Sequence, residues 1–319
     1  MLSTIERKHA WAVVLAGGDG ERLRPLTDRL TGDARPKQFC TLFGDRTLLG
    51  HTRDRIAPLF YEEQTLFVLS RHHENYYRPE LHGTLPQNSI VQPSNRGTAV
   101  AIALCLEEIM RRDEEARVAF FPSDHHYSNA QAFRSCVASA LTSNEEYPHH
   151  IMMLGTKPAY AETEYGWIEP GRTLVDTPTS PLRRVCRFWE KPSARQAAAL
   201  SERGCLWNTF VMAGLATAYI ELLRQTVPEL SRAVENGFRS GQLDLLYDRV
   251  TPVDFSSQVL SPRPQLLLVV CDTASGWTDL GNPRRLIEAL ANDGIRPSWF
   301  DEVHLRAAPA VIEVRRTLS

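Results

Sequence analysis

The chain has 319 residues, of which 43% are hydrophobic, and its 36 Lys and Arg against 38 Asp and Glu give a formal net charge of −2. This length allows one or two domains with a full core, while the balanced charge excludes the broad basic surface typical of proteins that bind nucleic acid or anionic membranes. No apolar run approaches the ~20 residues that span a bilayer, the first residues lack the apolar segment of a secretory signal, and no two of the six cysteines have CxxC spacing, so we expect a soluble cytoplasmic protein.

Short apolar runs alternate with amphipathic stretches in the first half of the chain. The runs that predict strands are 11–16, 65–70, 89–93, 117–124 and 150–155. The stretches that predict helices are 47–59, 72–82, 97–112 and 130–141. This alternation is typical of parallel strands joined by helices that cover both faces of a sheet.

The second half of the chain is less regular, but predicted strands and helices still alternate along it. Strands are predicted at 184–192, 206–214 and 265–271, and helices at 193–203, 217–227 and 283–293. No repeat or proline-rich linker marks a boundary. We therefore predict an α/β, Rossmann-like fold whose sheet is mixed but mainly parallel, with one catalytic domain at 1–290. Residues 291–319 form a short extension in which 310–316 is a single predicted strand.

The stretch WAVVLAGGDGERLRPLT, residues 11–27, places three glycines and two arginines directly after a buried strand. Ligands bind beyond the carboxyl ends of strands in open parallel sheets. Glycines let the backbone approach a ligand, and successive N–H groups form a nest for anions. Arg22, Arg24 and Lys37 add positive charge suited to phosphate. The stretch therefore predicts a polyphosphate site.

Three glycine-loop designs compete for this stretch. The GxxxxGK[ST] pattern of a P-loop is absent, and Pro25 disfavours the immediate long helix that a dinucleotide-binding GxGxxG turn opens. Together with RPKQF at 35–39, the stretch resembles the signature GGxGxRLxPLT…PK of the sugar-1-phosphate nucleotidyltransferases. The remaining alternative is a plain glycine turn with surface arginines.

Further segments resemble the mannose-1-phosphate guanylyltransferase branch of that family, in order, from residue 11 to about 290. They are QFCTLFGDRTLLGHTRDR (38–55), QPSNRGTAVAI (92–102), FFPSDHH (120–126), RFWEKP (187–192), LWNTFVMAG (206–214) and GWTDLGNP (276–283). The resemblance implies a GT-A type Rossmann-like fold. It also implies a reaction in which an NTP and a sugar-1-phosphate give an NDP-sugar and pyrophosphate.

The resemblance assigns roles at the nucleotide end of the site. The residues implied to bind the nucleotide are Leu15, Ala16, Gly17, Gly18, Gly20, Arg22, Lys37, Gln92, Asn95, Gly97, Thr98, Ser123 and Asp124. Arg22 and Lys37 are the implied catalytic cations on the leaving pyrophosphate. Asp124 and Asp279 are the implied ligands of Mg²⁺, a hard cation that prefers carboxylate and phosphate oxygens. The alternatives are a turn cap for Asp124 and an Asx turn for Asp279.

A second group of residues is implied to hold the sugar phosphate. Its members are Gly166, Glu169, Glu190, Lys191, Asn208 and Thr209, with Lys191 as the third catalytic residue. In-line attack on the α-phosphorus needs positioning and charge neutralisation more than acid or base groups. The alternative for Glu190 and Lys191 is an exposed charged pair at a strand end.

Three positions depart from the family pattern. Phe210 stands where WNsGxF has glycine, which predicts a reshaped sugar pocket. Gln92 stands where the guanylyltransferase branch commonly has glutamate, and an asparagine is common near Gly97. A glutamate accepts from guanine N1–H and N2–H₂, whereas a glutamine pairs with uracil or thymine as readily. The sequence of residues 37–49, KQFCTLFGDRTLL, resembles the guanylyltransferase branch and therefore still favours GTP.

We therefore expect a Mg²⁺-dependent transferase that uses GTP and mannose-1-phosphate to make GDP-mannose. The alternatives are a UTP- or dTTP-dependent glucose-1-phosphate transferase, a catalytically silent regulatory module on the same fold, and a nicotinamide-dependent dehydrogenase. The expected partners are the two substrates, with no nucleic acid and no membrane. The sequence does not determine the oligomeric state, and a homodimer is one possibility that it allows.

Overall fold

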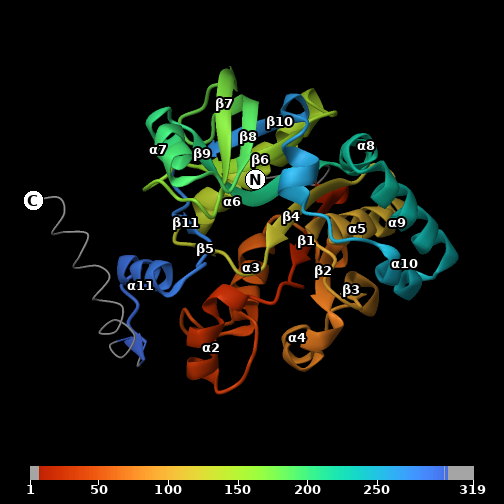
Figure 1. The fold of residues 1–319 in the computed structure, drawn as a ribbon, viewed down its shortest axis with the longest axis horizontal. Helices are drawn as coiled ribbons and strands as arrows, with labels where there is room; N and C mark the ends of the chain where they lie inside the picture. Colours follow the sequence, from red (N-terminus) through yellow and green to blue (C-terminus); the bar gives the residue numbers. More distant parts are fainter. Residues whose placement is uncertain (1–6, 298, 301–319) are drawn as a thin grey trace, which may run out of the picture.

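The computed structural model describes residues 7–297 and 299–300, and a nine-stranded sheet runs through their centre in the order β3-β2-β1-β4-β9-β6-β10-β8-β7 (Figure 1). Its strands are β1 (Ala10–Leu15), β2 (Thr65–Ser70), β3 (Ser89–Gln92), β4 (Arg117–Pro122), β6 (Ile151–Thr156), β7 (Gly166–Val175), β8 (Leu182–Glu190), β9 (Leu206–Leu215) and β10 (Leu267–Asp272). A separate two-stranded sheet pairs β5 (His126–Tyr127) with β11 (Trp277–Thr278).

Most strands of the large sheet point the same way. β1 lies parallel to β2 and β4, β2 to β3, and β6 to β10, whereas β9 runs antiparallel between β4 and β6. β8 is antiparallel to both β10 and β7. The predicted class, a mixed and mainly parallel Rossmann-like sheet flanked by helices, is confirmed.

Helices cover both faces of this sheet (Figure 1). They are α2 (Arg24–Thr31), α3 (Leu48–Ile56), α4 (Glu74–Glu80), α5 (Thr98–Arg112), α6 (Ala130–Glu146), α7 (Ala194–Glu202), α8 (Ala216–Thr226), α9 (Pro228–Ser240), α10 (Leu243–Arg249) and α11 (Pro283–Asn292). α5, α8, α9 and α10 bury one apolar cluster against the sheet, and α3, α6 and α7 bury a second on the other face. Side chains at Thr47, Asn129, Ser193 and Asn282 cap four helices by accepting from first-turn N–H groups.

Short 3-10 turns connect several of these elements. They are η1 (Glu21–Leu23), η2 (Lys37–Phe39), η3 (Glu62–Gln64), η4 (Arg71–His73), η5 (Pro86–Asn88) and η7 (Pro264–Leu266), while η6 (Ser256–Leu260) is a π-helical turn. Two of these turns lie near the glycine loop in the sequence: η1 directly follows it, and η2 begins at Lys37.

The structure adds elements that the sequence pattern did not predict. The glycine loop opens through η1 directly into α2, because Pro25 lies in the first turn, where its missing N–H costs nothing. A helix therefore does follow the loop directly. It has only eight residues, so it is not the long helix that Pro25 was expected to disfavour. β7 was missed because its outer half, from Pro170, loses the apolar alternation, and α9 and α10 were missed after Pro228.

A third apolar cluster includes the last described residues. Leu23 and Leu26, beside and within α2, pack with Leu286 and Leu290 of α11, and Phe300 joins them. The start of the predicted extension is thus packed against the domain, and the division at residue 290 stays a prediction. The predicted strand 310–316 lies outside the described residues.

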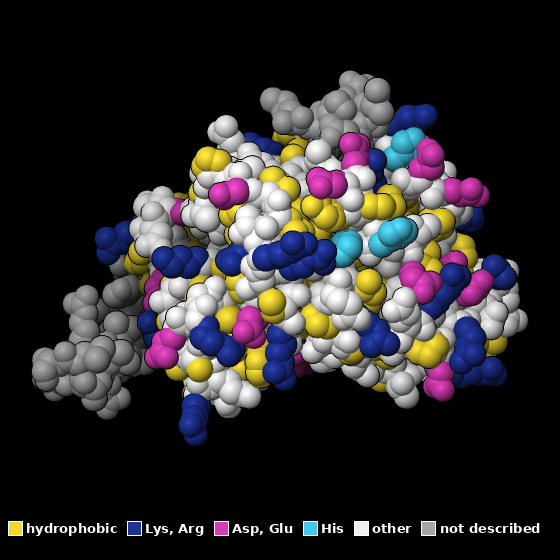
Figure 2. All heavy atoms as spheres, turned by 90° about the horizontal axis from the view of Figure 1, so that it is seen from above, with side chains coloured by type: hydrophobic (Ala, Val, Ile, Leu, Met, Phe, Trp, Pro, Cys, Tyr) yellow, Lys and Arg dark blue, Asp and Glu magenta, His cyan; other side chains and the backbone are white. Residues whose placement is uncertain are grey.

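The surface carries charges of both signs. Figure 2, seen from above Figure 1, shows a band of Lys and Arg side chains across this face with His side chains at one end, and acidic groups scattered around it. Among the residues that the structure describes, no helix has the length and apolar character needed to cross a membrane.

Candidate active site

The glycine loop, residues 16–20, lies at the carboxyl ends of the parallel strands β1, β2 and β4. Gln38 fixes it, because its Nε2 donates to the carbonyl oxygens of Ala16 at 3.1 Å and Gly18 at 2.8 Å. Gly20 has φ of 62°, and a Cβ there would lie 3.1 Å from the backbone nitrogen of Lys37. Leu15 ends β1 and accepts from the Ser123 N–H at 3.2 Å. The loop and the Lys37 segment therefore form one packed unit.

Lys37 joins two aspartates that lie far apart in the sequence. Its side chain is 7% exposed, and its Nζ lies 3.2 Å from Asp124 Oδ2 and 2.6 Å from the carbonyl oxygen of Asp279. Asp124 comes two residues after β4, and Asp279 comes directly after β11. The structure thus brings the three predicted residues together beside the glycine loop.

The Asp279 carboxylate is held mainly through one of its two oxygens. Its Oδ1 accepts from the Tyr165 hydroxyl at 2.6 Å, from Arg285 Nη1 at 2.8 Å and from the Gly281 N–H at 2.8 Å. The last contact is the Asx turn considered as the alternative, so this local role accompanies the others. Oδ2 has a longer contact, 3.4 Å, with Nη2 of the half-exposed Arg22. With this single longer contact, Oδ2 is less occupied than Oδ1.

Arg285 is a buried cation, with its side chain only 4% exposed. Besides Asp279 it contacts Glu162 and lies 3.1 Å from Glu164 Oε2. Burial alone would raise the pKa of Asp279, but the positive charges of Arg285 and Lys37 outweigh burial and lower the pKa to about 2. Asp279 is therefore ionised at neutral pH.

The segment that carries Asp124 is tied down on both sides. Thr52 on α3 donates to the Ser123 carbonyl oxygen at 3.3 Å. The Trp277 indole N–H donates to Nδ1 of His125 at 3.1 Å. Burial lowers the pKa of His125 to about 4, so this ring is neutral at pH 7 and carries its proton on Nε2, 3.8 Å from Asp124 Oδ1. The neighbour of Asp124 is thus a fixed neutral imidazole.

Gln92 ends β3 beside the glycine loop and is 6% exposed. A Cβ on Gly17 would lie 2.9 Å from its Nε2, and its Oε1 accepts from the Tyr247 hydroxyl at 2.8 Å. The predicted base-recognition side chain therefore lies next to the predicted phosphate loop.

The loop that starts α5 contains the other predicted nucleotide-binding residues. Asn95 Oδ1 accepts from the Gly97 N–H at 3.0 Å, and Thr98 Oγ1 accepts from the Phe255 N–H at 3.1 Å. Gly97 has φ of 83°, and a Cβ there would lie 2.3 Å from the carbonyl oxygen of Val253. This position requires glycine. The Asn95 side chain holds the loop's own backbone, whereas the Thr98 side chain ties the loop to the backbone of Phe255.

Four predicted sugar-phosphate residues lie together. A Cβ on Gly166 would lie 2.9 Å from Glu190 Oε2 and 3.4 Å from the Asn208 Cβ. The Lys191 side chain is 65% exposed, and its Nζ lies 3.7 Å from Glu190 Oε1. Burial raises the pKa of Glu190, and the charge of Asp254 adds to this. The pair is therefore a mostly buried carboxylate beside an exposed ammonium, rather than two exposed charges.

Glu169 lies apart from that group. Along β7 it is three residues from Gly166, so its side chain leaves the opposite face of the strand. There its Oε2 accepts from the Trp189 indole at 3.4 Å and lies 3.5 Å from Arg203. The structure does not bring Glu169 to Glu190.

Thr209 is fully buried in β9 and also stays outside the group. Its hydroxyl donates to the Leu154 carbonyl oxygen at 2.9 Å and accepts from the Val211 N–H at 3.3 Å. Both contacts lie where the pairing of β9 with β6 shifts register between Met153 and Gly155. The hydroxyl stabilises this irregularity.

Backbone strain gathers beside the site residues. The described non-glycine residues with positive φ are Lys191 (44°), Phe210 (59°) and Leu280 (50°). They follow or neighbour Glu190, Asn208 and Asp279. Such conformations cost roughly 1–3 kcal/mol each and cluster at functional sites. The family glycine at position 210 also has a backbone reason here, because this position is left-handed.

The left-handed backbone at 210 gives a testable stability order. Phe210→Gly and Phe210→Ala both remove the ring, but only glycine adopts positive φ without steric cost. We expect the glycine variant to be more stable than the alanine variant by about 1 kcal/mol in urea unfolding. At neighbouring Val211 the order should reverse, because glycine weakens an ordinary strand position. A less stable glycine variant at 210 would contradict the left-handed assignment.

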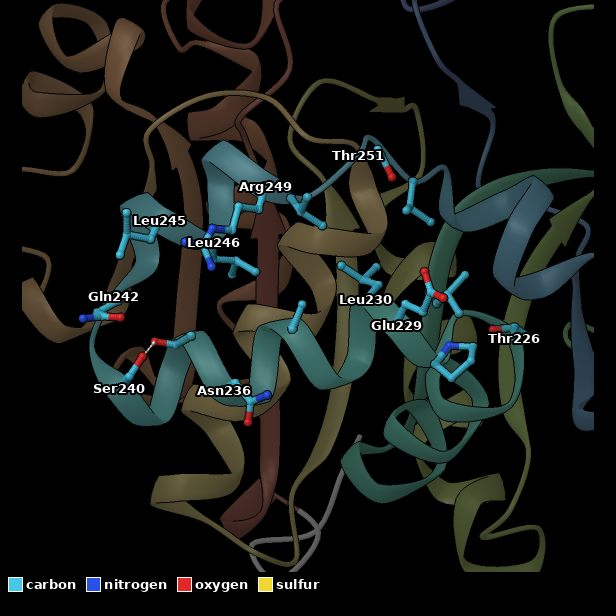
Figure 3. Close-up of a pocket in the computed structure, with 16 residues that line it drawn as sticks. Thr226, Glu229, Leu230, Asn236, Ser240, Gln242, Leu245, Leu246, Arg249 and Thr251 are labelled. Atoms are coloured by element: carbon cyan, nitrogen blue, oxygen red, sulfur yellow. Dashed lines mark hydrogen bonds between the residues drawn. The ribbon is translucent and has the colours of Figure 1, made fainter.

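Two cavities flank this region. One of about 230 Å³ is lined partly by Tyr165, Trp277 and Arg285, behind Asp279. Another of about 1030 Å³ lies between α9 and α10, where Leu230, Leu246 and Arg249 line it (Figure 3). None of the predicted site residues lines the larger cavity, so cavity volume does not identify the candidate active site.

Asp124 and Asp279 fit a Mg²⁺ ion that is also bound by substrate phosphates. Magnesium is usually held by one or two carboxylates plus phosphate oxygens and waters. Asp279 Oδ2 and the 27% exposed Asp124 side chain provide such carboxylate oxygens. Among the described residues there is no group of three or more His, Cys, Asp or Glu side chains that could hold a metal without substrate.

Sequence reasoning missed several side chains of this region. The most important are Tyr165, Arg285 and Tyr247. Arg285 lies one turn into a helix whose Asn282 cap is visible in the sequence, but nothing local indicates that it contacts Asp279. The contact depends on where α11 packs.

The whole domain matches one known family. Residues 11–294 match the family described as Nucleotidyl transferase, and the chain therefore belongs to it. A solved structure described as mannose-1-phosphate geranyltransferase from Thermus thermophilus superimposes with a TM-score of 0.77 at 31% identity, over 91% of this chain and 80% of that one. A UDP-glucose pyrophosphorylase complexed with UDP-glucose shares the fold, with a TM-score of 0.57 at 15% identity over 89% of this chain and 97% of that one.

The similar curated proteins are longer than this chain. Mannose-1-phosphate guanylyltransferase 2 of Escherichia coli O157:H7 is 30% identical over 85% of this chain and 58% of its own length. The mannose-1-phosphate guanylyltransferase of Sinorhizobium fredii is 31% identical over 84% of this chain and 52% of its own length. The xanthan biosynthesis protein XanB of Xanthomonas campestris is 29% identical over 88% of this chain and 60% of its length. The chain thus spans somewhat more than half of these relatives.

Proposed function

We propose that this protein transfers a nucleotidyl group from GTP to mannose-1-phosphate, giving GDP-mannose and pyrophosphate. The observation that carries the proposal is the convergence of Lys37, Asp124 and Asp279 beside the glycine loop. The relatives named mannose-1-phosphate guanylyltransferase support the choice of sugar and base.

In the proposed reaction a phosphate oxygen of the sugar-1-phosphate attacks the α-phosphorus in line. The new O–P bond forms as the bond to the β-phosphate oxygen breaks, and pyrophosphate leaves. Lys37 and Arg22 would neutralise the leaving pyrophosphate, and the loop N–H groups would hold it. The exposed ammonium of Lys191 would hold the attacking phosphate. No proton donor or acceptor is required for this step.

Asp124 and Asp279 would hold a Mg²⁺ ion, whose charge stabilises negative charge on the phosphates in the transition state. The fixed position of Asp279, set by Arg285 and Tyr165, keeps one oxygen directed at the site. The neutral His125 adds no positive charge beside Asp124 at pH 7.

A UTP- or dTTP-dependent glucose-1-phosphate transferase is the second candidate, favoured by Gln92. The decisive experiment is a panel of GTP, UTP, dTTP, ATP and CTP against mannose- and glucose-1-phosphate, with pyrophosphate release measured. We expect the highest kcat/KM with GTP and mannose-1-phosphate. A higher value with UTP or dTTP and glucose-1-phosphate would establish the second candidate, and no release with any pair would favour a silent module.

A further inference from the structure

Tyr247 reaches the base-recognition side chain from a distant part of the chain. It is carried by α10, the helix whose Leu245, Leu246 and Arg249 face the larger cavity (Figure 3). Tyr247 itself is 2% exposed, and its hydroxyl lies 2.8 Å from Gln92 Oε1. The two positions are 155 residues apart in the sequence, which explains why no local sequence pattern indicates this contact.

The hydrogen bond fixes which end of the Gln92 amide faces the glycine loop. Burial raises the pKa of the Tyr247 hydroxyl, which therefore stays protonated and donates to Oε1. The opposite end, Nε2, lies 2.9 Å from the position of a Cβ on Gly17. Turning the amide over would place its NH₂ group on the tyrosine and leave the buried hydroxyl proton without this acceptor, which costs free energy.

An amide held this way offers N–H donors toward the loop side of the site. Guanine O6 and the O4 of uracil and thymine accept hydrogen bonds, whereas adenine N6 and cytosine N4 are amino groups that donate. A donor facing a donor leaves both unpaired, and a site with a buried unpaired polar group rejects that ligand.

Resting on the proposed nucleotidyltransferase function, we propose that Tyr247 is a positioning residue that orients Gln92 to select oxo bases, as in GTP, UTP and dTTP, against the amino bases of ATP and CTP. It deepens the assignment of the nucleotide site without depending on which oxo base is used. Tyr247 touches no substrate in this proposal and acts only through Gln92.

The test uses the full chain and the Tyr247→Phe variant, which keeps the ring and removes only the hydroxyl. Equilibrium dissociation constants are measured by calorimetry for the five nucleoside triphosphates with Mg²⁺, and kcat/KM for the pairs that turn over. We expect the preference for the best oxo nucleotide over ATP and CTP to fall about 5- to 10-fold, the size of one neutral hydrogen bond, with kcat at saturating nucleotide changed less than about 2-fold.

Tyr219→Phe is the matched control. Tyr219 is also fully buried, and its hydroxyl has no hydrogen-bond partner among the described residues, so its removal should leave base preference unchanged. Gln92→Met should lose the preference as Tyr247→Phe does. Adding Tyr247→Phe to Gln92→Met should then change the preference less than about 2-fold, because residues that act through one contact are not additive.

The outcomes separate the two proposals. A wild-type protein that prefers oxo nucleotides, with an unchanged preference in Tyr247→Phe, overturns the role of Tyr247 and leaves the transferase function standing. Additive effects of the two substitutions also overturn it. If the wild-type protein binds nucleotides with this preference and Tyr247→Phe lowers it, but nothing is transferred to either sugar phosphate, the transferase function fails while the role of Tyr247 stands. If it binds no nucleotide, both fail.

Discussion

Replacing Asp124 with asparagine is expected to lower kcat about 100- to 1000-fold while leaving the fold intact. The substitution keeps the side-chain shape but removes the charge that lies 3.2 Å from Lys37 Nζ. Without this charge Asp124 would hold Mg²⁺ poorly, and losing a preorganised positive charge that stabilises the transition state costs about this much in other enzymes. Pyrophosphate release at saturating GTP and mannose-1-phosphate, over a range of Mg²⁺ concentrations, measures the effect.

Asp54→Asn is the control for this prediction. Asp54 lies on α3 with 58% of its side chain exposed and pairs with Arg46 at 2.9 Å. Exposed pairs contribute little, so this variant should retain wild-type turnover and stability. Turnover of Asp124→Asn within about 3-fold of wild type would remove Asp124 from the catalytic site.

Replacing Arg285 with methionine is expected to destabilise the protein by about 3–5 kcal/mol, the usual cost of removing one partner from a buried ion pair. The change leaves Asp279 and Glu162 without their shared cation, and it frees the Asp279 carboxylate from its 2.8 Å contact. Urea unfolding at pH 7 measures the loss. Since Asp279 then loses its orientation, kcat should also fall in the fraction that remains folded.

The difference between wild type and Arg285→Met should depend on pH in a definite direction. The pKa of Asp279 is about 2 in the folded protein against an ordinary 3.8. A carboxyl whose folded pKa is depressed stabilises the fold above its unfolded pKa, and this stability is lost as pH falls through the folded pKa. In the variant Asp279 lacks the charge of Arg285. The stability gap should therefore be full at pH 6 and shrink as pH falls from about 4 toward 2.

Arg284→Met is the matched control on the same helix. Arg284 is 59% exposed and pairs with Glu288 at 2.7 Å, so its loss should cost less than about 0.5 kcal/mol at any pH. Equal losses for the two arginine variants, or a gap that widens on acidification, would contradict the role given to Arg285.

Much of the fold was predictable because burial leaves a periodic pattern in the sequence. The strands at 11–16, 65–70 and 265–271 read as continuous apolar runs, which is what a strand covered on both faces requires. β7 was not predicted from the sequence because only its first three residues are buried. The short antiparallel pair of β5 and β11 was not predicted either, because strands of two residues are too short to show a hydrophobic period.

The candidate site was predictable where one residue type carries the chemistry by itself. The glycines and Lys37 predict phosphate binding from their position, and the family resemblance adds Asp124 and Asp279 as Mg²⁺ ligands. The structure brings Lys37, Asp124 and Asp279 together. Glu169 and Thr209 were both predicted to bind the sugar phosphate, yet the Glu169 side chain leaves the opposite face of its strand from Gly166, and the Thr209 hydroxyl is occupied by backbone contacts. Motif position gives no information on which way a side chain points.

The sequence by itself determined the family, the layered α/β architecture and the place of the glycine loop, because these depend on local patterns of glycine, charge and hydrophobic period. Tertiary structure alone decided that Arg285 holds one oxygen of Asp279, that Tyr247 orients Gln92 and that position 210 is left-handed. The physical reason is that hydrophobic periodicity specifies which face of an element is buried but not what it is buried against. Contacts between residues 92 and 247, or 165 and 279, exist only once the helices and loops have packed on the sheet.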